Sequence, residues 1–220
     1  MNVKSNGHEH EFEPAFGLPE PLPKGERMLW QGAPGFKDLA LRVFHLRKAA
    51  VYFALMIASR AAFLTYSGQG WADVLYGLML PVFLAAFALA ALAVLAWLTV
   101  STTAYTLTDQ RVVMRIGIVL TLTFNLPLKR IETAGLQLHK NGFGDIPFAL
   151  NSGDRIGWLN LWPHARPWRI AKPEPMLRCI PDAEIFAVQL QQAWAAATGK
   201  ITLPVPAAAA NQPHWQAGLT

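Results

Sequence analysis

The chain has 220 residues, of which 53% are apolar and only 15% are charged, and its formal net charge is +5. It is therefore more apolar than an average soluble protein, and its modest positive charge does not indicate a nucleic-acid partner. The single cysteine, Cys179, excludes an internal disulfide, so the cysteine count gives no sign of an oxidising compartment.

The first part of the chain is polar, net acidic and rich in proline and glycine. Because residues 1–27 show no apolar period, we expect a flexible tail, and the pattern is not that of a signal peptide. Residues 28–48 are expected to form an amphipathic juxtamembrane segment. From Phe36 to Lys48, apolar and basic residues recur at helical spacing, which predicts a helix at the level of lipid headgroups. A plain lead-in to a membrane span is the alternative.

Two apolar runs follow, at residues 49–66 and 74–100. The second is uncharged throughout and, at about 1.5 Å per residue, is longer than the ~20 residues that cross the hydrocarbon of a bilayer. A buried helix of a soluble protein rarely stays apolar on every face over this length. We therefore predict a transmembrane hairpin. Trp71, Tyr76 and Trp97 lie near the two ends of the second run and resemble aromatic residues of the membrane interface.

The basic residues around the runs predict the topology. Arg47 and Lys48 precede the first run, whereas the loop between the runs has neither lysine nor arginine. The positive-inside rule therefore places both termini in the cytoplasm. Arg60 interrupts the first run. Its side chain either extends toward the interface or pairs with a partner's carboxylate inside the bilayer.

After residue 100 the apolar pattern becomes alternating, as in a half-buried strand. Asp182 and Gly199 frame a closing helix, with Phe186, Leu190, Trp194 and Ala197 on one face. This pattern predicts a membrane α plus β protein in which residues 101–199 form a cytoplasmic PH-like antiparallel roll with a C-terminal helix. Residues 200–220 are expected to be a disordered tail. Strands are expected at 104–108, 111–119, 120–128, 131–138, 145–150, 157–162 and 176–180.

Several stretches resemble the bacterial PH-like domain of many small membrane proteins: GERMLWQGAP, YTLTDQRVVMRIG, LPLKRIETAGL and NGFGDIPF. The opening HEFEPAFGLPEPLPKGERMLWQG and the later LWPHARPWRIAKPEPMLRCIPD are more specific. They resemble the photosynthetic-complex assembly proteins of purple bacteria, over roughly residues 8–198.

The resemblance implies a non-enzymatic protein of the bacterial cytoplasmic or intracytoplasmic membrane. It would help to build the reaction-centre and light-harvesting 1 core complex, with core subunits and membrane lipids as partners. The alternative is a general membrane-anchored PH-like module that binds lipid headgroups or other membrane proteins. A stripe of small residues would permit the close helix packing of a homo-oligomer: Ala86, Ala90 and Ala93.

The pattern of reactive residues predicts no enzyme, no cofactor and no metal. Cys179 has no histidine near it in sequence, so a nucleophile is not indicated. His139 and His164 are far from each other and from Cys179, without the spacing of metal ligands.

A loop broken by two prolines carries the most informative polar residues. Because tryptophan and arginine are enriched at binding hot spots and at membrane interfaces, the loop is a candidate binding site for a protein or a lipid headgroup. The alternative places both tryptophans in the core. The candidates are Trp162, His164, Arg166, Trp168 and Arg169.

A second candidate surface is basic. Lys129 and Arg130 are near Arg111 and Arg115 in sequence, and together they would form a face toward anionic lipid. An ordinary solvated face is the alternative.

Overall fold

The computed structural model describes residues 17–18, 20–139, 141–151 and 156–200. The chain divides into a helical unit, Phe36–Leu98, and a β-domain that combines Met1–Gly35 with Thr99–Thr220. Most of both predicted tails lies outside the described residues. The part of the first tail that is described is not all loose, because Leu18 and Glu26 are buried.

The helical unit begins with α1 (Phe36–Asp38) and a π-helical turn, η2 (Leu39–Val43). The predicted amphipathic helix from Phe36 to Lys48 is therefore wrong as one continuous element. The chain leaves helical geometry at Phe44 and His45, and His45 has a left-handed backbone with φ of 53°.

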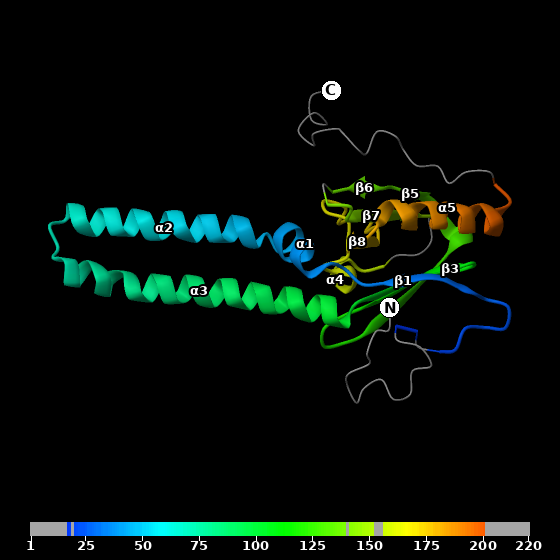
Figure 1. Cartoon of the computed structure of the whole chain (residues 1–220), viewed down its shortest axis with the longest axis horizontal. Helices are drawn as coiled ribbons and strands as arrows, with labels where there is room; N and C mark the ends of the chain where they lie inside the picture. Colours follow the sequence, from blue (N-terminus) through cyan, green and yellow to red (C-terminus); the bar gives the residue numbers. More distant parts are fainter. Residues whose placement is uncertain (1–16, 19, 140, 152–155, 201–220) are drawn as a thin grey trace, which may run out of the picture. The chain divides into compact units, whose positions relative to one another are not determined.

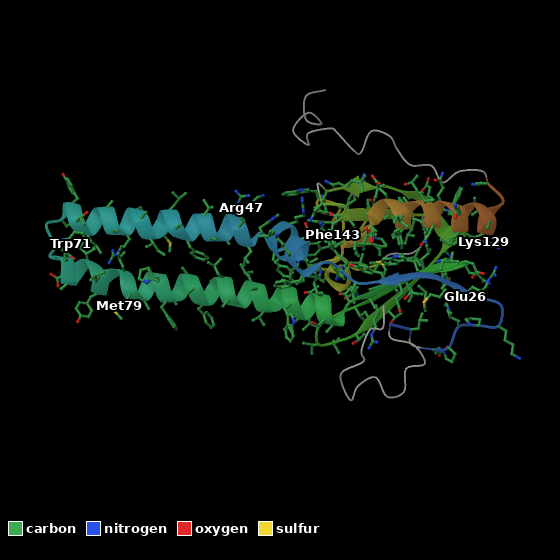
Figure 2. The ribbon with its side chains drawn as sticks, in the orientation of Figure 1. Glu26, Arg47, Trp71, Met79, Lys129 and Phe143 are labelled. Atoms are coloured by element: carbon green, nitrogen blue, oxygen red, sulfur yellow. The ribbon has the colours of Figure 1, made fainter. Side chains whose placement is uncertain are left out.

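Two long apolar helices follow, α2 (Leu46–Tyr66) and α3 (Trp71–Thr102), joined by a short turn (Figure 1). Both are long and apolar enough to cross a membrane, by length and composition. Only 6% of each apolar window is buried, unlike a helix in the core of a soluble protein. Figure 2 shows the side chains projecting from these helices, among them Met79, which is 65% exposed. Where the helices meet, a Cβ on Gly77 would lie 2.8 Å from Leu64 Cδ1, so Gly77 permits their close approach.

The β-domain has a first sheet of four antiparallel strands in the order β1-β2-β3-β4. The strands are β1 (Met28–Gly32), β2 (Ala104–Thr108), β3 (Arg111–Ile116) and β4 (Leu122–Pro127). The prediction that residues 28–48 form a juxtamembrane segment is therefore wrong for residues 28–32, because these residues form β1, which pairs with β2. The two neighbouring strands lie on either side of the helical unit in sequence, which local patterns cannot reveal.

The second sheet has the order β5-β7-β6, with β8 also paired to β7. A 3-10 turn, η3 (Leu128–Arg130), leads into it, and its strands are β5 (Ile131–Ala134), β6 (Gln137–Leu138), β7 (Gly144–Leu150) and β8 (Met176–Ile180). The strand predicted at 157–162 is wrong. The structure forms a helical turn there, α4 (Trp158–Leu161), in which the amide of Trp162 bonds to the carbonyl of Trp158.

Helix α5 (Ala183–Thr198) closes the domain. The predicted apolar face is confirmed, because Phe186, Leu190 and Trp194 are buried in the domain core. Phe186 meets Trp30 of β1 edge to face at 4.7 Å, so the helix also holds the strand that comes before the helical unit. Gly199 ends the helix with φ of 70°, as expected, but Asp182 makes no side-chain cap. Two long apolar helices and an antiparallel β-domain with a C-terminal helix confirm the predicted fold class.

Candidate functional site

The predicted binding loop is a long hairpin between α4 and β8, here called the Trp/Arg loop (residues 162–174). Its base is closed by an antiparallel bridge between Ala165 and Pro175. The amide of Arg166 donates to the carbonyl of Glu174 at 2.9 Å, and the amide of Met176 donates to the carbonyl of His164 at 2.8 Å. The base is therefore fixed, and the tip, residues 167–173, projects from it.

His164 anchors this loop from inside the domain. Its ring is fully buried, with Nδ1 2.6 Å from the hydroxyl of Tyr105 and Nε2 3.3 Å from the hydroxyl of Thr103. The Tyr105 oxygen accepts the amide of Arg178 at 3.3 Å, which leaves its hydroxyl proton available to Nδ1. Burial, aided by the charge of Arg178, lowers the pKa of His164 to about 3. His164 is thus a neutral core residue, and the prediction that it contacts a partner is wrong.

Two arginines of the loop are directed at one acid. Arg166 Nη1 lies 2.7 Å from Glu174 Oε2, and Arg169 Nε lies 3.8 Å from Glu174 Oε1. The Glu174 side chain is only 8% exposed, whereas that of Arg169 is 54% exposed. Arg166 therefore stiffens the base of the loop, and Arg169 presents more of its side chain to the surroundings.

The tip of the loop displays apolar side chains. Trp168 is 94% exposed on a left-handed backbone with φ of 63°, and Ile170 is 67% exposed. Trp162, beside α4, is about half exposed. The alternative that placed both tryptophans in the core is wrong. The sequence reasoning missed Ile170, because it looked for aromatic and basic residues alone.

The Trp/Arg loop begins beside the residues that follow α3. Thr103, which contacts His164, comes directly after the last residue of that helix, and Ala104 opens β2. Ala104 pairs with Arg115 near the end of β3. We call this end of the first sheet, marked by Thr103, Ala104 and Arg115, the α3 end.

A second apolar loop lies at the α3 end, the β3–β4 loop (residues 117–121). Val119 is 90% exposed and Leu120 is 78% exposed. Gly117 allows the turn, since it has φ of 119° and a Cβ there would collide with the carbonyl of Leu120. The strands predicted at 111–119 and 120–128 covered this stretch, and no surface was predicted there.

The predicted basic face does not form as one surface. Arg111 pairs with Pro127 at the opposite end of β3 and β4 from Arg115, and Lys129 and Arg130 follow Pro127. We call this the turn end, marked by Asp109 and Gln110. Arg111 Nε is bound there by Glu26 at 2.9 Å. Figure 2 shows Glu26 and Lys129 at one end of the domain and Phe143 at the other.

The remaining basic candidates lie on α2. Arg47 and Lys48 are in its first turn and Arg60 is six residues before its end, and all three are exposed. Their position at the membrane interface stays a prediction.

One polar cluster was missed because its members are distant in sequence. Donor atoms of His139, Asp145 and Cys179 lie within 4.8 Å of one another, so the prediction that His139 is far from Cys179 is wrong. These are donor types that zinc uses. However, Asp145 Oδ2 lies 3.7 Å from the guanidinium of Arg178 as well as 3.3 Å from His139 Nε2, and Oδ1 accepts the amide of Cys179 at 2.7 Å. A cation and an amide already engage the carboxylate, so the cluster is best described as a buried ion-pair network.

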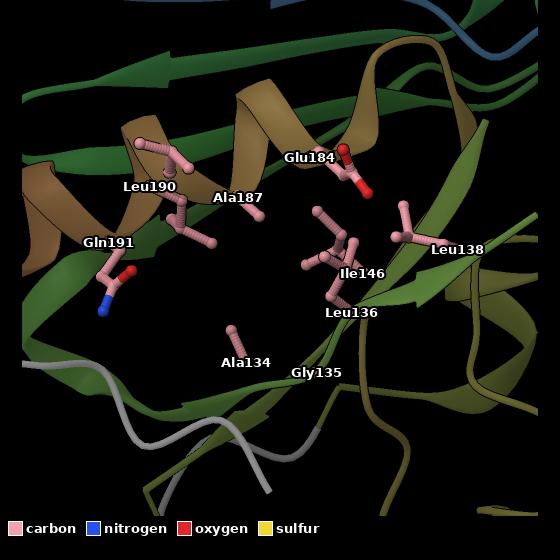
Figure 3. A pocket seen from close by; sticks show the side chains of 10 residues that line it. Ala134, Gly135, Leu136, Leu138, Ile146, Glu184, Ala187, Leu190 and Gln191 are labelled. Atoms are coloured by element: carbon pink, nitrogen blue, oxygen red, sulfur yellow. The ribbon is translucent and has the colours of Figure 1, made fainter. Parts of the chain in front are cut away.

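A groove of about 420 Å³ runs between α5 and the second sheet (Figure 3). Leu136, Leu138 and Ile146 line one side, and Ala187 and Leu190 of α5 line the other. Its wall is mainly apolar, and Glu184 is its acidic residue.

Comparison with known proteins agrees with this architecture. A curated relative is an uncharacterised 23.7 kDa protein of Rhodobacter capsulatus from the puhA 5′ region. It is 39% identical over 201 residues, which cover 84% of this chain and 87% of that protein. No solved structure matches the chain. The family model described as a bacterial PH domain matches residues 49–194, which include α3, most of α2 and most of the β-domain. The chain therefore belongs to the bacterial PH domain family.

Proposed function

We propose that this chain is a non-enzymatic assembly factor of the PuhB type for the photosynthetic reaction-centre and light-harvesting 1 core complex. In this proposal α2 and α3 anchor it in the bacterial cytoplasmic or intracytoplasmic membrane, with both termini in the cytoplasm. The β-domain and the spans then hold core subunits during assembly.

The observation that carries the proposal is the origin of the Rhodobacter relative in the puhA 5′ region. It agrees with the resemblance of the opening segment and of the Trp/Arg loop to photosynthetic-complex assembly proteins. The described part of the opening leads into β1, and the loop is anchored on Thr103 and Tyr105.

A general headgroup-binding module is less well supported. It would use Lys129, Arg130 and Arg166 together, but Arg166 is paired with Glu174 and the other two follow β4 at the turn end. These three residues therefore do not form one surface that could bind an anionic headgroup.

Deletion of the gene in a purple bacterium that encodes it tests the proposal. We expect the absorption of the core complex to fall strongly while that of the peripheral antenna persists, because only core assembly needs the factor. Re-expression of the full chain should restore the core absorption. Normal core levels in the deletion strain would overturn the proposal.

Affinity isolation from mild-detergent membranes tests the partners directly. We expect reaction-centre or light-harvesting 1 polypeptides to co-purify with the tagged full chain, and an absorption spectrum of the eluate to show whether pigment accompanies them. An eluate with lipid and this chain alone would contradict the partner assignment.

A further inference from the structure

Two loops far apart in sequence start beside the α3 end of the β-domain, and both display apolar side chains. The tip of the Trp/Arg loop exposes Trp168 and Ile170, and the β3–β4 loop exposes Val119 and Leu120. Exposed apolar side chains gathered at one end of a domain mark an interaction surface. Neither residues 117–121 nor residues 167–173 include an acid.

The chain limits how far these loops can be from a membrane that holds α3. Trp97, the expected interfacial residue, lies five residues before the helix ends at Thr102, or about 8 Å at 1.5 Å per residue. A single residue, Thr103, then separates α3 from β2. The bases of both loops are linked to this point. His164, at the base of the Trp/Arg loop, contacts Thr103, and Arg115, two residues before the β3–β4 loop, pairs with Ala104.

The chemistry of the tip suits the boundary between headgroups and acyl chains. Tryptophan prefers this zone, and isoleucine enters its apolar side. Arg169 and Lys172 are exposed beside them and complement anionic headgroups. Val119 and Leu120 supply the corresponding apolar side chains on the second loop.

We propose that these two loops insert into the headgroup–acyl boundary of the membrane that holds α2 and α3, on its anionic face. The inference rests on the membrane anchoring in the proposed function, but it requires no core subunit. Together with α3, the loops would give the β-domain three points of attachment to the membrane.

Site-directed fluorescence in reconstituted vesicles tests the inference. The full chain is labelled with an environment-sensitive fluorophore at Ile170→Cys or Leu120→Cys, in vesicles containing anionic lipid and spin-labelled lipid as quencher. Lys129→Cys, exposed near the turn end, is the matched control. Leu84→Cys, on α3, reports insertion of the hairpin. The parent chain, whose Cys179 is buried, gives the labelling background.

We expect the lipid quencher to reduce the fluorescence at positions 170 and 120 at least threefold more than at position 129, and aqueous iodide to show the reverse order. Equal quenching at all three positions, with strong quenching at Leu84→Cys, would overturn the inference and leave the anchoring intact. That outcome would favour a protein partner for the loops. Absence of quenching at Leu84→Cys would overturn both. Loss of core assembly is measured separately in cells, so the two proposals fail in different experiments.

Discussion

The two ends of the first sheet are built from the same strands and have opposite chemistry. At the turn end, Glu26 accepts the hydroxyl of Thr108 at 2.7 Å and the Nε–H of Arg111 at 2.9 Å. The amide of Arg27 also bonds to Asp109 Oδ1 at 3.0 Å. At the α3 end, the adjoining loops expose valine, leucine, tryptophan and isoleucine.

This difference shows that the strands supply the framework while the connections decide what each end meets. Polar groups that satisfy one another close the turn end, which suits contact with water. The loops that start at the α3 end have no such polar closure, and their exposed apolar side chains are the kind that mark an interaction surface. The following predictions test the contrast, from the largest expected effect to the smallest.

Asp145→Ala should destabilise the β-domain most, beside the anchor of the Trp/Arg loop, since Arg178 contacts both Tyr105 and Ala165. Arg178, with a side chain 13% exposed, would lose its carboxylate, and an uncompensated buried charge costs about 3–5 kcal/mol. Chemical unfolding of the full chain in detergent, followed by tryptophan fluorescence, measures the change. Asp145→Asn keeps an acceptor for the amide of Cys179 and should cost less. Equal losses in the two variants would show that the charge has no special role.

Lowering the pH should weaken the anchor of the Trp/Arg loop. The pKa of His164 is about 3 in the folded chain and about 6.5 when unfolded, so between these values the unfolded chain binds a proton that the folded chain does not. The contribution is therefore intact above pH 6.5, and stability falls as the pH drops toward 3, by an order of a few kcal/mol. Unfolding midpoints between pH 7.5 and 5 check this. His164→Gln should flatten that part of the profile, and an unchanged slope would contradict the assignment.

Tyr105→Phe should loosen the same anchor without a change of charge. His164 Nδ1 and the amide of Arg178 would both lose the hydroxyl, at a cost of about 1–3 kcal/mol. Hydrogen exchange of residues 161–176 should increase more than that of the turn end. A uniform increase over both ends would argue for a general loss of packing.

At the turn end, Glu26→Ala should cost about 1–3 kcal/mol, because Thr108 and Arg111 lose their shared acceptor. Glu132→Ala, which removes an exposed acid, should stay within about 0.5 kcal/mol in the same unfolding experiment. If the two variants behaved alike, the polar closure of this end would not contribute to stability.

The smallest effect is expected for Lys129→Gln combined with Arg130→Gln. These residues follow the turn end, so lipid quenching of the probe at Ile170→Cys should not change. A clear loss of quenching would show that the basic residues contact the membrane and would remove the contrast between the two ends.

Local patterns in the sequence predicted much of the fold. The apolar runs identified α2 and α3, and the alternation identified β2, β4 and β8. The missed features depend on contacts between distant residues. β1 is recognisable only by its pairing with β2, and His139 meets Cys179 only after β7 and β8 pair.

The binding role of the candidate site stays a prediction. Tryptophan and arginine indicated the Trp/Arg loop, and Trp168 is exposed there. Periodicity could not show that His164 lies in the core, because its partners Thr103 and Tyr105 are about 60 residues away in the chain. For the same reason, the shared position of the two apolar loops became visible only through the pairing of β2 with β3.

The position of β1 has a consequence for biosynthesis. This strand is translated before the helical unit, yet its partner β2 is translated only after α3 is complete. During synthesis, the strand must therefore wait until both helices have left the ribosome. A hairpin of α2 and α3 that forms first brings residues 35 and 103 toward each other and lowers the entropy cost of closing the sheet. The β-domain then cannot finish folding ahead of the two helices, and maturation of the chain runs from the helices to the domain.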